Sequence, residues 1–198
     1  NQISPSFCGA KWFNATVWLE SGHTTSCHHP PYHKIPLKDV IKNYKALHNT
    51  HEKKQYRKEM LEGKRPDECE YCWKIEDCGK EYVSDRVFKS IIYSQDQLLS
   101  AKNKYQAHED VDPINLEVSF DSKCNLACAY CNPSFSTTWQ KDIKENGIYL
   151  DLVSDGKDLY QQTGISNQFI SNEGDHFNPY LDAFFEWWNR GLKYSLRE

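Results

Sequence analysis

The stretch "INLEVSFDSKCNLACAYC", residues 114–131, runs from an alternating segment directly into three closely spaced cysteines. Apolar and polar residues alternate over 114–120, which predicts a β-strand. The thiolates of Cys124, Cys128 and Cys131 are soft ligands that suit iron–sulfur clusters and zinc. Three thiolates leave one iron of a four-iron cluster open to another ligand. A loop that follows a parallel strand would lie at the C-terminal mouth of a barrel, where such folds carry their chemistry.

The segment "CNLACAYC", placed after a strand, resembles the signature of the radical S-adenosylmethionine (radical SAM) superfamily. The continuation "NPSFSTTW" is similar to members that carry an additional cluster domain. The resemblance implies that Cys124, Cys128 and Cys131 hold a 4Fe-4S cluster whose fourth iron binds S-adenosylmethionine. It also implies that Tyr130 lies near the adenine. The alternative, from spacing alone, is a zinc ion shared between the three cysteines and a fourth ligand from elsewhere.

In that superfamily, one electron from the cluster cleaves S-adenosylmethionine, and the resulting 5'-deoxyadenosyl radical abstracts a hydrogen atom from the substrate. The resemblance therefore implies a radical SAM enzyme that acts on a peptide or protein. It also implies an electron donor such as flavodoxin or ferredoxin as a partner. The alternative function is a zinc-stabilised, non-enzymatic interaction module. No general acid or base stands out in the sequence, so no catalytic side chain is predicted.

Five further cysteines occur within the first 78 residues: Cys8, Cys27, Cys69, Cys72 and Cys78. The spacing of Cys8, Gly22 and Cys27, C-x(13)-G-x(4)-C, resembles the start of SPASM and twitch domains, which hold auxiliary 4Fe-4S clusters. A CxxC pair, Cys69 and Cys72, follows. The resemblance implies a second cluster on Cys8, Cys27, Cys69 and Cys72, for two clusters in all.

Several alternatives at these N-terminal cysteines stay open. Cys78 is the spare thiol of the predicted set, but it replaces Cys8 or Cys27 in a second possible set. Zinc is the alternative metal, because zinc ribbons also use separated cysteine pairs. His28 and His29 adjoin Cys27, and we expect them to surround a metal site rather than to ligate it. The cysteine-rich segment precedes the strand here, whereas the family places its auxiliary domain after the barrel.

Composition limits the class of protein. The 198 residues include 28 acidic and 24 basic side chains, and the formal net charge of -4 argues against a broadly cationic nucleic-acid surface. No apolar run approaches the roughly 20 residues of a membrane span, and the first residues lack a secretory signal. We therefore expect a cytoplasmic protein with neither membrane nor nucleic acid as a partner. In a reducing compartment, eight cysteines indicate metal or redox chemistry rather than disulfides.

The predicted fold class is α/β, with the start of a partial TIM-like radical SAM barrel preceded by a small cysteine-rich α+β domain. The expected units are residues 1–83 for the SPASM/twitch-like cluster domain, 84–112 for a connecting helix and linker, and 113–198 for the N-terminal part of the barrel. Only 67 residues follow Cys131, whereas a full barrel takes about 250 residues. The family's Gly-Gly-Glu stretch is absent as well. We therefore expect an incomplete barrel that belongs to a longer or split enzyme.

Local patterns predict a hairpin and several helices. Ser21 and Gly22 are turn residues between two extended segments. Helical periodicity predicts one helix that begins at Leu37 and one from Ser84 to about Lys102. A closing helix is predicted over 179–192. The predicted buried side chains of the last two helices are Val87, Ile91, Leu98 and Leu99, and Leu181, Phe184, Phe185, Trp188 and Leu192.

Overall fold

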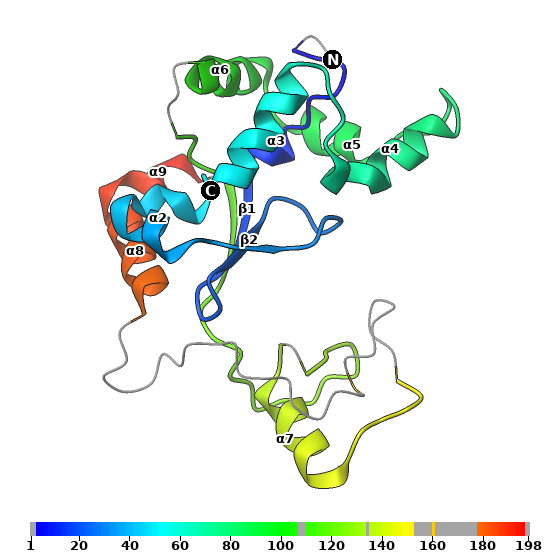
Figure 1. Ribbon diagram of the computed structural model, residues 1–198, viewed down its shortest axis with the longest axis vertical. Coiled ribbons are helices and arrows are strands. Elements are labelled where there is room, and N and C mark those ends of the chain that lie inside the picture. The colour runs from blue at the N-terminus through cyan, green and yellow to red at the C-terminus, as the bar shows by residue number, and fades with distance from the viewer. Residues whose placement is uncertain (1–2, 107–109, 134, 153–159, 161–177, 197–198) are drawn as a thin grey trace.

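The structure is a computed structural model that describes residues 3–106, 110–133, 135–152, 160 and 178–196. An open four-stranded sheet with strand order β3-β2-β1-β4 forms its centre (Figure 1). The strands are β1 (Asn14–Trp18), β2 (His23–Thr25), β3 (His33–Lys34) and β4 (Asn115–Ser119). The α/β class is confirmed. The expected TIM-like barrel is not evident among the described residues, because β3 and β4 end the sheet as separate edges.

The first two strands form the predicted hairpin. β1 and β2 pair antiparallel, with Thr16 opposite Thr25. The turn contains Gly22, whose φ of 63° lies in the left-handed region that glycine adopts without strain. A Cβ atom at Gly22 would lie 2.2 Å from the ring of Tyr180, so the C-terminal helix also packs closely against this turn.

The predicted strand at 114–120 is confirmed as β4, and it pairs in parallel with β1. The register runs from Asn14 opposite Asn115 to Trp18 opposite Ser119. One sheet therefore contains strands from both sides of the predicted 84–112 linker. This pairing brings the loop after β4 into the same fold as the N-terminal cysteines.

Helices surround the sheet (Figure 1). Helices α3 to α6 lie toward one end of the strands, α2 and α8 lie beside the sheet, and α7 lies beyond its opposite end. In chain order they are α1 (Ala10–Phe13), α2 (Leu37–Lys42), the 3-10 helix η1 (Tyr44–Leu47), α3 (His51–Leu61), the 3-10 helix η2 (Asp67–Cys69), α4 (Glu70–Asp77), α5 (Asp85–Ile91), α6 (Gln95–Gln106), α7 (Thr137–Asn146), α8 (Pro179–Trp187), the π-helical turn η4 (Trp188–Leu192) and α9 (Lys193–Ser195).

Two apolar clusters form the core of the described chain. The first contains Phe7 and Trp12, whose rings stack at 4.4 Å, together with Met60 of α3, Trp73 of α4 and Leu98 of α6. Cys8 and Cys69 belong to this cluster, so the N-terminal thiols lie at the margin of a packed core. The second cluster packs strand residues against α2, η1 and α8, and its largest member is Trp187.

The predicted buried faces of two helices were wrong in part. In place of one helix from Ser84, two helices form, and only Leu98 of the predicted stripe is buried, whereas Val87, Ile91 and Leu99 are exposed. In the closing helix, Phe184 and Leu192 are buried as expected. Phe185 and Trp188 are exposed, and Tyr180, Ala183 and Trp187 are buried in their stead. The helix thus turns a different face to the sheet from the one that the aromatic pattern predicted.

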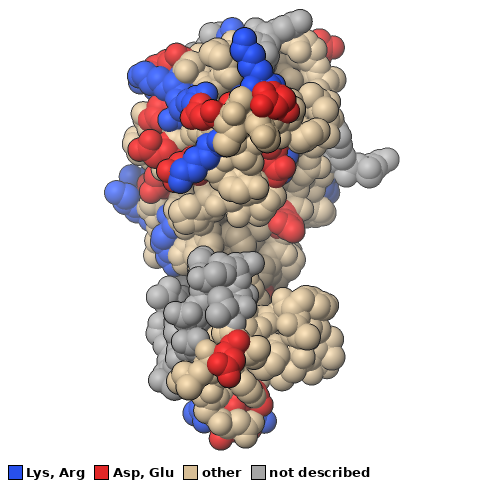
Figure 2. Space-filling model, turned by 90° about the vertical axis from the view of Figure 1, so that its right-hand side faces the viewer, with Lys and Arg blue, Asp and Glu red and all other residues tan. Residues whose placement is uncertain are grey.

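Within the described residues, no helix combines the length and apolar character needed to cross a bilayer. On the face drawn in Figure 2, basic and acidic side chains are interspersed over the helical part of the molecule. That face carries no extended patch of a single charge sign.

Candidate metal centres

The four N-terminal cysteines predicted as ligands line one small cavity. Cys8, Cys27, Cys69 and Cys72 are all on its wall, and its volume is about 20 Å³. Cys78 does not line it: its thiol is exposed and donates to the Lys74 carbonyl at 3.2 Å. The structure therefore brings together the set in which Cys78 is the spare cysteine.

Three separate segments position these thiols. Cys8 precedes α1, and its carbonyl accepts from the Lys11 backbone N–H at 3.1 Å. Cys27 lies just after β2, in a turn that Thr25 stabilises by donating its hydroxyl to the Cys27 carbonyl at 2.8 Å. Cys69 ends η2, and Cys72 lies one turn into α4. The CxxC spacing places the last two thiols on adjoining turns of one helical segment.

Burial controls the protonation of these thiols. Burial raises the pKa of Cys69 to about 11, with Lys11 opposing the rise and the neighbouring Cys8 thiol adding to it. Burial also raises the pKa of Cys8 and of Cys72. At neutral pH these three side chains are therefore thiols in the absence of a metal. A metal must displace their protons in order to bind, which makes its affinity dependent on pH.

The spacing of the sulfur atoms bears on which group fits between them. In the described part of the chain, the one set of three potential ligand atoms lying within 4.8 Å of one another is that of Cys27, His28 and His29. The four cysteine sulfurs are therefore spread more widely. A tetrahedral zinc ion with bonds of about 2.3 Å would hold its four sulfurs roughly 3.8 Å apart. The four sulfurs are therefore not arranged as a tetrahedral ion would hold them, and four cysteine donors suit either zinc or an iron–sulfur cluster.

An ion pair between Glu76 of α4 and Arg86 of α5 lies beside the small cavity. Arg86 donates to both carboxylate oxygens of Glu76, at 2.9 and 2.8 Å, and to the Phe7 carbonyl at 2.8 Å. Its guanidinium also lies over the Trp73 ring, 5.0 Å from the centroid. Arg86 thus ties the segment of Cys8 to the helix of Cys72.

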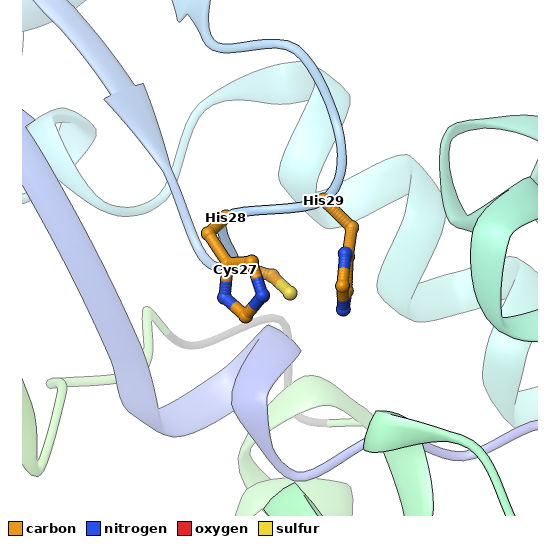
Figure 3. Close-up of side chains that lie close together, drawn as sticks. All are labelled: Cys27, His28 and His29. Atoms are coloured by element: carbon orange, nitrogen blue, oxygen red, sulfur yellow. The ribbon is translucent and has the colours of Figure 1, made fainter. Parts of the chain in front are cut away.

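Cys27, His28 and His29 project from one loop toward the same side (Figure 3). His29 faces Asp85 through Nε2 at 2.9 Å and stacks on the Tyr71 ring at 3.8 Å. His28 is largely exposed and lies 3.1 Å from the Lys89 ammonium through Nδ1. Both histidines have these partners in the structure, yet their ligand atoms also lie within 4.8 Å of the Cys27 sulfur, so their expected place around a metal rather than on it stays a prediction.

The three-cysteine loop is fastened to the first turn of α7. Thr137 accepts from the Cys124 backbone N–H at 3.1 Å through Oγ1, and the Trp139 indole donates to the Cys128 carbonyl at 3.1 Å. Ser136, the N-cap of α7, donates to the Leu126 carbonyl at 3.3 Å. These bonds hold the backbone of the loop, while the three thiols stay partly exposed.

Tyr130 lies over the same three thiols. Its side chain is 92% exposed, and hydrogen bonding to Cys128 raises the pKa of its hydroxyl, with Cys131 and Cys124 adding to the effect. The three thiols and this ring therefore meet at one exposed surface. The expected contact of Tyr130 with adenine stays a prediction.

A larger cavity of about 790 Å³ lies beside the N-terminal site. Cys27, His28 and Lys89 line it, and so does Asn132, which follows Cys131; the three loop cysteines themselves are not among its lining residues. Its wall includes Trp18 and Tyr32, whose rings lie 5.4 Å apart. The volume falls within the usual range of about 300–1,000 Å³ for ligand pockets.

The sequence analysis missed the charged residues of the small cavity. Lys11, Asp85, Arg86 and Lys89 line it together with the cysteines. Asp85 and Lys89 have i, i+4 spacing in the sequence, but that spacing alone indicates an ordinary pair on a helix surface. No protein-family model, curated protein or solved structure matches this chain.

Proposed function

We propose that this chain is a segment of a radical SAM enzyme with two 4Fe-4S sites. One observation carries the proposal: Cys8, Cys27 and the CxxC pair Cys69 and Cys72 come from three separate segments, yet the four cysteines line one cavity. Such convergence is what an auxiliary cluster would need, and it accompanies a CxxxCxxC loop of the radical SAM type at 124–131. The mixed charge of the surface and the cysteine content suit a cytoplasmic enzyme that modifies a peptide or protein.

Each part of the chain has a role in this proposal. Cys124, Cys128 and Cys131 would hold the cluster that reductively cleaves S-adenosylmethionine, so that a hydrogen atom can be abstracted from the substrate. β4 would be a strand of a partial barrel, and α7 fixes the loop by its bonds to the Cys124 and Cys128 backbone. The exposed ring of Tyr130 is available to contact the adenine.

The large cavity supports the same proposal, because its wall includes residues from both cysteine-containing regions. A substrate bound there would contact Cys27 and Asn132, the residue after Cys131. The aromatic wall formed by Trp18 and Tyr32 suits an apolar side chain of a peptide. An electron donor such as flavodoxin or ferredoxin would supply the reducing electron.

Metal analysis of anaerobically purified chain tests the two sites together. We expect about eight iron atoms per chain with matching sulfide, because two cubane clusters would be present. Cys72→Ala should lose about half of the iron, whereas the matched control Cys78→Ala should keep it, since Cys78 lies outside the cavity. Equal iron loss in both variants would contradict the proposed ligand set.

Reductive cleavage tests the three-cysteine loop. In the complete enzyme, Cys128→Ala should abolish cleavage of S-adenosylmethionine while the N-terminal iron is retained. Cleavage at the unsubstituted rate would refute the assignment of this loop.

A zinc-stabilised interaction module is the second candidate. The small cavity volume, about 20 Å³, favours it, because this space suits a single ion better than a cluster. Zinc at stoichiometric amount with no labile sulfide would support this function and exclude the first.

A further inference from the structure

The ammonium group of Lys89 lies at the centre of a ring of acceptors beside Cys27. Its Nζ atom is 3.2 Å from the Cys27 sulfur, 3.1 Å from Nδ1 of His28 and 3.1 Å from a carboxylate oxygen of Asp85. An ammonium group has three hydrogens and no acceptor. The three neighbours therefore match its full donor capacity.

This arrangement explains the group formed by Cys27, His28 and His29 in Figure 3. Their ligand atoms cluster as if around a cation, and the Lys89 ammonium is that cation for two of them. His29 is held separately by Asp85 and by the Tyr71 ring. The bonds to His28 and Asp85 thus hold the Lys89 ammonium beside the Cys27 sulfur.

The three cations on the wall of the small cavity all pair with a carboxylate: Lys11 with Glu68, Arg86 with Glu76 and Lys89 with Asp85. Lys89 differs from the other two in its bond to a sulfur atom. Within the described chain, the hydrogen bond from a cation of this wall to a cysteine sulfur is the one that Lys89 donates. Lys89 also lines the large cavity, so it stands where the two cavities meet.

We propose that Lys89 is a positioning residue that donates a hydrogen bond to the ligand sulfur of Cys27 and raises the reduction potential of the N-terminal cluster. The inference rests on the proposed function, which places a cluster on Cys8, Cys27, Cys69 and Cys72. Reduction adds negative charge to the cluster and its sulfur ligands. A donated hydrogen bond and a nearby positive charge stabilise that added charge more in the reduced state than in the oxidised state. Cys27, the sulfur on which Lys89 would act, also lines the large cavity.

A redox titration followed by electron paramagnetic resonance tests the role of Lys89. The full chain would carry serine at the three loop cysteines, so that only the N-terminal site is reconstituted with iron and sulfide. The variants compared in that background are Lys89→Met, Lys89→Arg and the control Lys74→Met. Lys74 is a suitable control because it forms an exposed ion pair with Glu70 and does not line the cavity.

At a fixed potential, Lys89→Met should lower the ratio of reduced to oxidised cluster about tenfold, which is a shift of about 59 mV for one electron. Lys89→Arg should recover most of this loss, because it keeps the charge and the donor, and Lys74→Met should match the background. Loss of the cluster in Lys89→Met with retention in Lys89→Arg would also support the role.

An unchanged potential in Lys89→Met, or an equal effect of Lys74→Met, would overturn the inference while leaving the cluster assignment intact. Loss of the cluster in both Lys89 variants would overturn it too, because a cation at position 89 would then not be enough to preserve the cluster. Failure of the unsubstituted background to take up iron and sulfide would instead overturn the proposed function, and the inference with it.

Discussion

Arg86 connects two of the segments that surround the small cavity, through bonds to Glu76 and to the Phe7 carbonyl. Its bidentate pair with Glu76 is largely shielded from solvent, with 10% and 17% of the two side chains exposed. Burial opposes ionisation of Glu76, but the hydrogen bonds from Arg86 and Ser84 outweigh it and lower the pKa of the carboxyl. Removal of Arg86 would take two hydrogen bonds from that carboxylate, which would keep the one from Ser84, and one from the Phe7 carbonyl.

Arg86→Met should therefore lower the free energy of unfolding by about 3 kcal/mol in metal-free protein. Urea denaturation followed by circular dichroism measures this. Arg65→Met is the matched control, because Arg65 lies over the same Trp73 ring but forms an exposed pair with Asp77. Arg65→Met should lower the free energy of unfolding by less than about 1 kcal/mol. Equal losses in the two variants would show that the ring contact, and not the shielded ion pair, stabilises this region.

At the scale of elements, internal caps explain where helix prediction failed. The predicted helix at 37–47 stops after Lys42, because the Asn43 side chain accepts from the Lys45 backbone N–H at 3.0 Å and begins η1. The predicted helix from Ser84 is interrupted before Gln95, where Ser94 and Gln97 bond reciprocally as a capping box. Both signals are present in the sequence. The helical spacing of the apolar residues did not reveal these caps, because a short break leaves the 3.6-residue pattern almost intact.

The N-cap of α7 links helix stability to the three-cysteine loop. Ser136 is fully buried, accepts from the Trp139 backbone N–H at 3.4 Å and donates to the Leu126 carbonyl at 3.3 Å. Ser136→Ala should lower the free energy of unfolding by about 1 kcal/mol, as for other caps. It should also speed alkylation of the loop thiols, because the loop loses an anchor. Peptide mass spectrometry of alkylated Cys124, Cys128 and Cys131 measures that rate.

Ser94→Ala is the control for this prediction, because Ser94 caps α6 and bonds to Gln97 instead of the loop. It should cost a similar free energy and leave alkylation of the loop unchanged. An unchanged rate in Ser136→Ala would show that Thr137 and Trp139 hold the loop without the cap.

At the scale of the whole molecule, the sequence suggested which thiols would meet but not what surrounds them. The resemblance to SPASM and twitch domains implied the set of Cys8, Cys27, Cys69 and Cys72, with Cys78 as a possible replacement, and the structure places those four cysteines on one cavity. The sequence also identified β4, because alternation is a local signal. The parallel pairing of β4 with β1 joins segments about a hundred residues apart, so local patterns did not contain it. The same is true of Lys89, which reaches Cys27 only through the tertiary fold.

The core also contains buried basic side chains, although burial of a charged group is unfavourable. Lys53 is fully buried, and burial followed by the charge of Arg57 lowers its pKa well below the ordinary value. Its amino group donates to the Thr24 hydroxyl at 2.8 Å and to the Thr25 carbonyl at 3.1 Å, which ties α3 to β2. His48 is buried beside these groups, and burial again lowers its pKa. Burial thus disfavours the protonated form of these basic groups, and protonation of the buried histidines at low pH is expected to destabilise the fold.

His33 on β3 permits a direct test of this acid sensitivity. Burial, and next the positive charge of the nearby Lys53, lowers the pKa of His33 to about 4. The pKa of a histidine in an unfolded chain is about 6.5. Between these values the unfolded chain binds a proton that the folded chain does not. The stabilising contribution is therefore complete above about pH 6.5 and is lost as the pH falls toward 4. The loss should reach up to about 3 kcal/mol, with His48 adding to it in the same direction.

Urea denaturation at a series of pH values measures this slope. His33→Gln should flatten the curve between pH 6.5 and 4, because glutamine keeps a polar group for the Thr50 hydroxyl, which lies 2.9 Å from Nε2, and does not titrate. The variant should keep part of the slope, since His48 is unchanged. A curve as steep as that of the unsubstituted chain would mean that His33 takes up its proton in the folded state, and that the acid sensitivity of this core arises from His48 instead.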